Sequence, residues 1–568
     1  MSKRVVIIGA VALGPKVACR LRRIDPEAEI TVIDRDSLIS YGGCGIPYYV
    51  GGDVADIESL YSTSAHAVRD IDFFRTCKDI NIISGVEAIG IDRQSKRVAI
   101  HHLDDGRKEE LEYDKLVIAT GSTPIRPDFP GVNLPRVFTI SNLHSARAIK
   151  DLVSKGLVEN AVVIGAGAVG IEMAEALSDL WDINTTIVEM AEQVLPTALS
   201  RGMARLVENE LKKNSVKVML SQRVIKINGD KTGVCSVDTT SGAIPCDLVV
   251  LSAGVKPNTE FASRAGLALG SSGALLVDRR MRTTDPDIYA GGDCVEVRNL
   301  VSGKNMTMPL GSLANRQGRT IAINISGGTS NFKGAVGTFC IKVFGMGIAK
   351  AGLTFKQALA SGFDPVYSIV AQDDRAHFYP TAQLMYIKLI ADRKSRKILG
   401  IEAVGANGDA VKARVDALAP LIAGGVEVED VCSLETAYAP PFASAMDIIN
   451  NAGNALDNIF DKRNRPIDVI DFLEDFSNGR TRVLDVRNPK EASSFIKKYG
   501  DKWINIPQSE LKSRLDEVPR DEPLCLLCNT GPRSYEAQIF LEGNGIVNTR
   551  NIQGGYGMIR AIDSKFVK

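Results

Sequence analysis

Short apolar runs alternate with segments of helical periodicity along most of the chain. The runs "RVVII" (4–8), "KLVI" (115–118) and "AVVI" (161–164) are almost wholly hydrophobic, as expected of strands buried on both faces of a parallel sheet. Several of these runs lead into a glycine-containing turn and then into a helical pattern. This order is typical of βαβ units, so the pattern predicts an α/β protein.

The chain has 568 residues, which is enough for roughly three to five domains. It carries 68 basic and 68 acidic side chains, so its net charge indicates neither a nucleic-acid partner nor an anionic membrane. Because the first residues run directly into an apolar strand, we expect no signal peptide, and no run reaches the ~20 apolar residues that span a bilayer. Ten scattered cysteines favour a cytoplasmic protein without structural disulfides, and we expect no metal site.

The first glycine motif is "GAVALG" at 9–14. Gly9 is expected to make the tight turn after the strand, and Gly14 to open the helix, while Val11 occupies the place of the usual middle glycine. Asp34 ends the next strand about twenty residues further on, where a carboxylate can bind a ribose hydroxyl. The motif predicts a dinucleotide site, although the missing glycine makes it only moderately specific.

The second glycine motif, "GAGAVG" at 165–170, is complete. Gly165 makes the turn, Gly167 lets a pyrophosphate approach the backbone, and Gly170 allows close packing of the helix. Glu189 ends the following strand. Because its carboxylate would repel a 2′-phosphate, we expect NADH to be preferred over NADPH.

Two further segments, "YDKLVIATGSTP" (113–124) and "DIYAGGDCVEV" (287–297), occur together with both glycine motifs. This combination resembles the flavoprotein disulfide reductases that contain two dinucleotide-binding folds, over about residues 1–455. The resemblance implies FAD and NADH as cofactors. It places Thr120 and Gly121 where the chain crosses between the two cofactor domains, and Asp293 at the FAD ribitol.

A single cysteine, Cys44, follows the first glycine motif in "SYGGCGIPYYVGG" (40–52). The spacing from Ser40 to Cys44 is similar to that in coenzyme A disulfide reductases, NADH oxidases and NADH peroxidases, in which one thiol faces the flavin. Peroxidases carry a histidine where Ala12 stands here, which counts against a peroxidase. The resemblance makes Cys44 the thiol that exchanges electrons with the flavin.

Coenzyme A disulfide reductases hold the phosphates of coenzyme A with basic residues on the first helix. Arg20 and Arg23 are three residues apart, and so lie on one face of that helix. In the same enzymes two tyrosines of the partner subunit reach the active-site cysteine, and Tyr379 and Tyr438 match their segments. The resemblance therefore implies bound coenzyme A and a homodimer.

The C-terminal segment "CNTGPRS" (528–534) follows an apolar run and precedes a helical pattern. It resembles the active-site loop of rhodanese domains, in which backbone N–H groups surround a cysteine and stabilise a persulfide. Cys528 matches the sulfur-carrying cysteine and Arg533 closes the loop. Asp485 and Arg487 match a strand motif of the same family. The usual segment before "INIP" is replaced by "KKYGDKW", so the scaffold there is expected to differ.

These observations give a fold class of α/β with four parts: two Rossmann-like dinucleotide-binding domains, an α+β dimerisation domain and a C-terminal α/β rhodanese domain. The boundaries expected from the sequence are 1–115 and 256–325 for the FAD domain, 150–255 for the NADH domain, 330–455 for the dimerisation domain, 456–466 for a linker and 467–568 for the rhodanese domain.

Taken together, the resemblances imply an FAD-dependent NADH reductase of persulfides, polysulfide or coenzyme A persulfide. Cys44 would pass electrons to the substrate, and Cys528 would carry sulfane sulfur by way of coenzyme A or a swing about the linker. Two alternatives remain open. One is a coenzyme A disulfide reductase or NADH oxidase whose rhodanese domain works independently. The other is a rhodanese domain that only docks a partner or braces the dimer.

Overall fold

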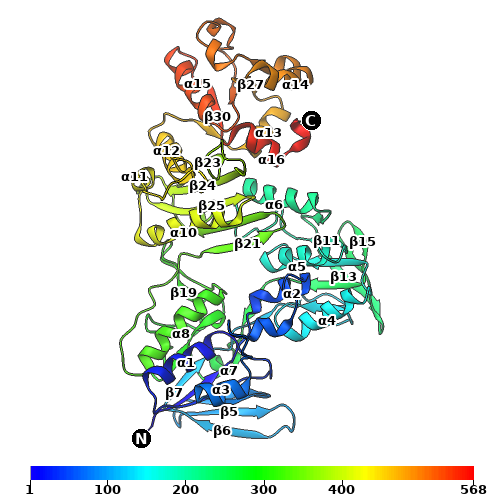
Figure 1. Cartoon of the computed structure of the whole chain (residues 1–568), viewed down its shortest axis with the longest axis vertical. Helices are drawn as coiled ribbons and strands as arrows, with labels where there is room; N and C mark the ends of the chain where they lie inside the picture. The colour runs from blue at the N-terminus through cyan, green and yellow to red at the C-terminus, as the bar shows by residue number, and fades with distance from the viewer. Residues whose placement is uncertain (1, 568) are drawn as a thin grey trace. The chain divides into compact units, whose positions relative to one another are not determined.

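The computed structural model describes residues 2–567. It contains two compact units, one made of residues 2–190 and 222–335 and the other of residues 191–221 and 336–567 (Figure 1). The helix α6 (Arg201–Lys213) thus belongs to the second unit, although it lies within the range expected for the NADH domain.

The first unit contains a parallel sheet built around the first glycine motif, in the order β18-β7-β1-β2-β3. Its strands are β1 (Arg4–Ile8), β2 (Glu29–Ile33), β3 (Asn81–Ile83), β7 (Lys115–Ile118) and β18 (Ile288–Ala290). Helices α1 (Leu13–Ile24) and α8 (Gly311–Ile325) pack against each other. The apolar side chains of β1 and β7 are buried, as the uninterrupted hydrophobic runs predict. The expected boundary at residue 115 falls at the first residue of β7.

A second parallel sheet is built around the second glycine motif. Strand β10 (Asn160–Ile164) pairs with β11 (Asn184–Val188) and with β16 (Leu248–Leu251), and β16 pairs with β9 (Val137–Thr139). Helices α4 (Leu143–Ser154) and α5 (Ala168–Ser178) follow β9 and β10 in the chain. Because β9 precedes residue 150, this sheet takes in more of the chain than the expected NADH domain.

Antiparallel strands and short helices fill out the first unit. One three-stranded sheet contains β4 (Val86–Asp92), β5 (Arg97–His102) and β6 (Lys108–Glu112), and another contains β13 (Val224–Asp230), β14 (Gly233–Thr239) and β15 (Gly242–Pro245). The short helices are α2 (Ile46–Gly51), α3 (Ile71–Lys78) and α7 (Glu260–Arg264). The strands β8 (Ser122–Pro124) and β17 (Val255–Pro257) pair where the chain passes between the two parallel sheets.

The second unit begins with an antiparallel sheet in the order β21-β22-β25-β24-β23, so that β23 is an edge strand. Its strands are β21 (Phe339–Val343), β22 (Met346–Gly352), β23 (Pro365–Asp373), β24 (Leu384–Asp392) and β25 (Ile398–Gly405). The helices of this part, apart from α6, are α9 (Phe355–Ser361), α10 (Gly408–Gly424), α11 (Val428–Cys432) and α12 (Ile448–Phe460).

The C-terminal part of the second unit is a parallel sheet in the order β26-β30-β29-β27-β28. Its strands are β26 (Pro466–Ile467), β27 (Arg482–Asp485), β28 (Trp503–Asn505), β29 (Leu524–Leu527) and β30 (Thr549–Ile552). Its helices are α13 (Val469–Ser477), α14 (Pro489–Tyr499), α15 (Pro532–Gly543), α16 (Gly555–Ile562) and α17 (Ser564–Val567).

The segment expected to be a linker, 456–466, is partly helical. Helix α12 continues to Phe460 because Leu456 and Ile459 extend its buried face, and the Asp457 carboxylate pairs with Arg396. The connection to β26 is therefore residues 461–465, about half of the expected segment.

No helix among residues 2–567 is long and apolar enough to cross a membrane. All ten cysteines are free thiols, and their exposure differs widely.

Candidate active site

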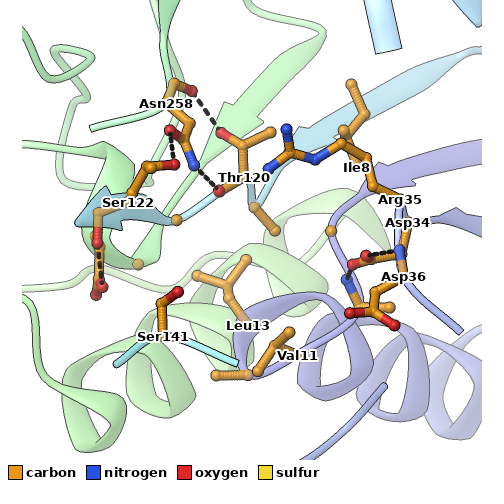
Figure 2. A pocket seen from close by; sticks show the side chains of 18 of the residues that line it. Ile8, Val11, Leu13, Asp34, Arg35, Asp36, Thr120, Ser122, Ser141 and Asn258 are labelled. Carbon is orange, nitrogen blue, oxygen red and sulfur yellow. Dashed lines mark hydrogen bonds between the residues drawn. The ribbon is translucent and has the colours of Figure 1, made fainter. Parts of the chain in front are cut away.

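A deep cleft opens in the first unit around the turn that follows β1. Its volume is about 930 Å³, near the upper end of the range of roughly 300–1,000 Å³ typical of ligand sites. The lining comes from the first glycine motif, from residues 34–36, from the "ATG" segment at 119–121 and from Asp293. Figure 2 shows Asp34 and Asp36 at one end of the cleft and Ser122 at the other.

The first glycine motif is fixed by steric contacts. Gly9 has a φ of +110°, and a Cβ there would lie 2.2 Å from the carbonyl oxygen of Ala119. A Cβ at Gly14 would lie 1.8 Å from the carbonyl oxygen of Gly9, so only glycine allows the helix to pack this closely on the turn. Val11 lines the cleft, where its side chain has room. The missing middle glycine therefore leaves the turn intact.

Carboxylates lie at both ends of this cleft. Asp34 accepts a hydrogen bond of 2.6 Å from the backbone N–H of Ala10, which places its side chain at the glycine turn. Asp293 accepts one of 3.0 Å from the Ser122 hydroxyl. Burial raises the pKa of both carboxyl groups. Half-buried carboxylates facing an open cleft suit a ligand rich in hydroxyl groups, such as a ribose or a ribitol.

The "ATG" segment is tied to the returning chain. The Thr120 hydroxyl donates to the carbonyl of Asn258 (2.7 Å), and the Asn258 amide donates back to the carbonyl of Thr120 (2.9 Å). Gly121 follows with a φ of +62°. This reciprocal pair, visible in Figure 2, fixes the backbone where the chain leaves one parallel sheet for the other.

Cys44 lies in a single 3₁₀ turn (Gly43–Gly45) directly before α2, and its neighbours Tyr41 and Gly43 line the cleft. The buried Ser40 has a φ of +52°, and its N–H donates to the carbonyl of Ala10 (2.7 Å), which anchors the cysteine segment to the glycine turn.

Cys44 is exposed as a whole, but its sulfur is partly desolvated. This desolvation raises the pKa of the Cys44 thiol, and the carboxylates of Glu172 and Asp293 raise it further. The protein alone thus disfavours the Cys44 thiolate.

The sequence analysis missed Glu172 and Tyr48. Glu172 lies in α5, and its carboxylate accepts a hydrogen bond of 3.4 Å from the hydroxyl of Tyr48 in α2. Burial raises the pKa of Glu172 to about 7, so this carboxyl group holds a proton in part near neutral pH. The available signal was an acid two residues after the last glycine of the second motif, but only the packing of α2 on α5 brings it to Cys44.

The second glycine motif has the geometry of a pyrophosphate site. A Cβ at Gly165 would lie 2.3 Å from the carbonyl oxygen of Ser252, and one at Gly170 would lie 2.0 Å from that of Gly165. A Cβ at Gly167 would meet nothing within 4 Å, so protein packing does not require glycine there. The open space suits close approach of a ligand to the backbone. The Glu189 carboxylate accepts a hydrogen bond of 2.7 Å from the backbone N–H of Ala166 at the same turn.

The three arginines of α1 have different surroundings. Arg22 turns away and donates two hydrogen bonds to the carbonyl of Asp79, at 3.0 and 2.7 Å. Arg23 is exposed, and the Nε of Arg20 is buried without a hydrogen-bond partner among residues 2–567. Arg20 therefore keeps donor capacity for an anion.

Two further cations near these arginines were not anticipated. Burial raises the pKa of the Cys19 thiol, while Lys78, Arg23 and Lys16 oppose this effect, so all three charges lie near Cys19. Lys16 precedes Arg20 by four residues, and this spacing could have indicated that the two side chains share one face of the helix. Lys78 belongs to α3. It is too far from Arg20 in the sequence for its position near the α1 arginines to be predicted.

The two tyrosine segments come together in the second unit. The Ala376 N–H donates to the carbonyl of Pro440 (3.3 Å), and the Ser444 hydroxyl donates to that of Arg375 (3.0 Å). These bonds join the loop that carries Tyr379 to the loop that carries Tyr438.

Arg414, a buried side chain of α10, holds both loops and was not anticipated. Its guanidinium donates to the carbonyls of Asp374 (3.0 Å) and Phe442 (3.3 Å) and to the Asp447 carboxylate (2.8 Å). Its position in a helical pattern gave no signal of this role.

Cys528 lies directly after β29, at the start of a tight loop that leads into α15. It is 1% exposed. Its Sγ accepts hydrogen bonds from the Gly531 N–H (3.0 Å) and from the Ser534 hydroxyl (3.3 Å). Donors directed at a buried sulfur stabilise negative charge on it. Arg533 is half-buried in the first turn of α15.

The buried ion pair of Asp485 and Arg487 supports this part of the fold. Their closest contact is 2.7 Å, and the indole N–H of Trp503 donates to Asp485 (3.1 Å). Trp503 belongs to the segment that departs from the rhodanese pattern. Its indole N–H connects that segment to the ion pair.

Two other cysteines are core residues. The Cys525 thiol accepts from the Thr481 hydroxyl (3.3 Å), and burial raises the pKa of Cys525 to about 11. The fully buried Cys294 donates to the carbonyl of Gly291 (3.2 Å), and burial raises the pKa of Cys294 to about 11. Neither thiol is suited to nucleophilic chemistry.

Comparison with known families identifies three parts. The model of the pyridine nucleotide-disulphide oxidoreductases matches residues 3–318, and the model of their dimerisation domain matches residues 339–448. A rhodanese-like domain model matches residues 468–561. The α/β fold class and the resemblance to a flavoprotein reductase with a C-terminal rhodanese domain are confirmed.

The chain is also similar to individual proteins. It is 33% identical to the NAD(P)H coenzyme A polysulfide/persulfide reductase of Pyrococcus horikoshii, over 79% of this chain and 97% of that protein. Among solved structures, the NAD-dependent persulfide reductase from A. fulgidus is 40% identical, with a TM-score of 0.92 over 98% of this chain and 99% of that one. The reduced CoADR-RHD of Bacillus anthracis is 34% identical, with a TM-score of 0.90 over 99% of this chain and 98% of that one. The chain belongs to the pyridine nucleotide-disulphide oxidoreductase family and is an oxidoreductase with a dimerisation domain and a C-terminal rhodanese-like domain.

Proposed function

We propose that this protein is an NADH-dependent flavoprotein that reduces persulfides and polysulfides, coenzyme A persulfide among them, and releases sulfide. The observation that carries the proposal is the presence in one chain of an exposed cysteine beside a dinucleotide cleft and a buried cysteine in a loop of hydrogen-bond donors. The names of the Pyrococcus horikoshii and A. fulgidus relatives agree with this reading.

FAD fits the cleft of the first unit. The glycine turn would take its pyrophosphate, Asp34 its adenosine ribose, and Asp293 its ribitol. The half-buried carboxylates line the cleft and leave room for hydroxyl groups. Thr120 and Gly121 would fix the backbone beside the ring system.

NADH fits the second glycine motif. Gly165 and Gly170 close the turn, and the open side of Gly167 leaves the backbone N–H groups accessible to a pyrophosphate. Glu189 directly follows β11 and would bind the adenosine ribose while repelling a 2′-phosphate.

Cys44 would act as the nucleophile. Its thiolate attacks the carbon-bound sulfur of a persulfide, the S–S bond of the substrate breaks, and hydrosulfide leaves while a mixed disulfide forms on Cys44. When bound, NADH and FAD supply the two electrons that reduce this disulfide and return Cys44 and the thiol product. Glu172, with a pKa near neutrality, is placed to exchange a proton near Cys44.

Coenzyme A would bind along α1. Arg20 keeps a buried donor without a partner, and Arg23 is exposed on the same side of the helix. Both suit phosphate groups, and Lys16 and Lys78 add positive charge nearby. Ser40 would then lie between the arginines and Cys44 along the pantetheine chain.

A homodimer would complete the site. The side chains of Phe378, Tyr438, Phe442 and Met446 are between 50% and 73% exposed and form the apolar surface of the joined loops. Exposed apolar side chains of this size mark an interface, and the dimerisation domain offers a second copy as the partner. Tyr379 and Tyr438 would approach the partner's Cys44 and protonate a leaving sulfur.

Cys528 would carry sulfane sulfur as a persulfide, with Arg533 closing the loop. Loop donors already reach its Sγ, so negative charge on a terminal sulfur would be stabilised. Ten free cysteines fit a reducing, cytoplasmic setting.

The test is NADH oxidation by the purified full chain with coenzyme A persulfide, polysulfide, coenzyme A disulfide and oxygen, and with sulfide measured in parallel. We expect the highest kcat/KM and stoichiometric sulfide with the persulfide substrates. Higher kcat/KM with coenzyme A disulfide or oxygen would favour the alternatives, a coenzyme A disulfide reductase or an NADH oxidase. Mass spectrometry for FAD, coenzyme A and sulfur adducts on both cysteines would identify the bound groups.

A further inference from the structure

The loop that holds Cys528 rests on the beginning of α16. The backbone N–H of Tyr556 donates to the carbonyl of Cys528, and the N–H of Gly557 donates to the carbonyl of Asn529, both at 2.8 Å. A Cβ at Gly555, whose φ is +56°, would lie 2.5 Å from the carbonyl oxygen of Cys528. The first turn of α16 thus holds two consecutive loop carbonyls, while the N–H of Gly531, in the same loop, donates to the sulfur of Cys528.

The same turn of α16 is held by the antiparallel sheet that belongs to the dimerisation domain. The hydroxyl of Tyr386, in β24, donates to the carbonyl of Gly557 (3.2 Å). The N–H of Ile369, on the edge strand β23, donates to the side-chain oxygen of Gln553 (2.6 Å). Tyr386 and Gln553 are 8% and 6% exposed, so water does not compete for these bonds. Gly557 therefore links the sheet to the loop, since its carbonyl binds Tyr386 and its N–H binds Asn529.

The other end of α16 is also capped from outside the rhodanese-like domain. The side-chain amide of Asn209, in α6, donates to the carbonyls of Ala561 (2.6 Å) and Ile562 (2.8 Å). Carbonyls at the C-terminus of a helix have no intrahelical hydrogen-bond donor, and here the Asn209 amide is their donor. Helix α16, which packs on both α6 and β23, is thus fixed at its two ends by elements of the rest of the second unit.

We propose that Tyr386 and Gln553 are positioning residues of the sulfur-transfer site. Strands β23 and β24 fix the first turn of α16, and this turn fixes the loop whose donors surround Cys528. The rhodanese-like domain then works as a fixed part of the second unit. A swing about residues 461–465 during sulfur transfer would break these buried bonds. The sulfur atom is therefore transferred while the rhodanese-like domain keeps its position in the second unit. The proposal rests on the proposed function in assigning sulfur transfer to Cys528.

The test compares two tyrosine variants of the full chain. Tyr386→Phe removes the bond to Gly557. Tyr367→Phe is the matched control, because the Tyr367 hydroxyl donates to Asp468 (3.2 Å) between the same two parts of the unit without touching the turn at 553–557. Sulfur transfer from thiosulfate to cyanide and the pH dependence of Cys528 alkylation by iodoacetamide are measured for each variant.

Tyr386→Phe should lower sulfur transfer about fivefold or more and move the pH midpoint of Cys528 alkylation upward by about half a unit. Tyr367→Phe should leave both within experimental error, and NADH-dependent bleaching of the flavin should be unchanged in both. If Tyr386→Phe fails to fold, judged by circular dichroism, Gln553→Met carries the same expectation.

Equal behaviour of the two tyrosine variants in the alkylation profile would overturn the positioning role. Absence of sulfur transfer in the wild type would instead count against the proposed function. The alkylation profile needs no sulfur substrate, so it decides the positioning role in that case as well.

Discussion

Cys44 and Cys528 differ in exposure, in neighbouring charge and in the source of their hydrogen bonds. Cys44 is exposed beside a wide cleft, and the nearby carboxylates of Glu172 and Asp293 raise its pKa. Cys528 is buried and receives an N–H and an O–H bond from its own loop. The first thiol therefore depends on groups that bind in the cleft, whereas the protein itself supplies the surroundings of the second.

The largest expected effect is that of Cys44→Ser. NADH-dependent sulfide release should fall by about 1,000-fold or more, because a hydroxyl cannot form the mixed disulfide. NADH should still bleach the flavin absorbance in stopped flow, since hydride transfer needs no thiol. Cys77→Ser, at another exposed thiol, serves as the control. A Cys44→Ser variant whose flavin no longer bleached would make Cys44 a structural residue.

Cys528→Ser should divide the substrates by size. Turnover with a protein-bound persulfide should fall about 100-fold, while turnover with coenzyme A persulfide should stay within about twofold, because the smaller donor can reach Cys44 directly. Steady-state sulfide release measures both, with Cys235→Ser as the control. Equal losses would indicate an obligatory relay through Cys528, and no loss with either substrate would support a docking role for the domain.

The prediction for Glu189 concerns the nicotinamide cofactor. Glu189→Ala should reduce the preference for NADH over NADPH about tenfold, or about 1.4 kcal/mol, because it removes the carboxylate expected beside a 2′-phosphate. The ratio of kcat/KM values is the readout, and Glu192→Ala is a control at the next acid in the chain. A wild type that used both cofactors equally would show that the ribose site lies elsewhere.

Glu172 affects stability rather than turnover. Burial raises its pKa from 4.5 to about 7, so the folded state retains a proton that the unfolded state loses. Stability should therefore fall as the pH rises from about 4.5 to 7, by about 1–3 kcal/mol, and Glu172→Gln should remove this fall. Thermal unfolding at pH 5 and pH 8 measures the difference, with the exposed Glu159→Gln as the control. Parallel pH dependence in all three proteins would contradict the assignment.

The sequence indicated the features that depend on local chemistry. A Cβ would collide with a carbonyl oxygen at four glycines of the two motifs, Gly9, Gly14, Gly165 and Gly170. The spacing of these glycines in the sequence therefore predicts the geometry of both turns. The sulfur loop is similarly local, because Cys528 and its two donors lie within seven consecutive residues.

The contacts that escaped prediction all join distant segments. Glu172 meets Tyr48 only because α5 packs on α2, and Arg414 holds two loops that lie on either side of it in the chain. The end of α12 was also missed, since charged residues suggested a linker while buried Leu456 and Ile459 continue the helix. The roles of individual site residues remain predictions.

The edge position of β23 has a consequence for dividing the chain. Ending the protein after Phe460 would remove Gln553 and leave the Ile369 N–H on an open edge, next to a Tyr386 hydroxyl that has lost its acceptor. Unpaired edge strands recruit strands of other molecules. We therefore expect a shortened form to be more prone to edge-to-edge aggregation than the full chain, and to need polar substitutions along β23 to stay dispersed.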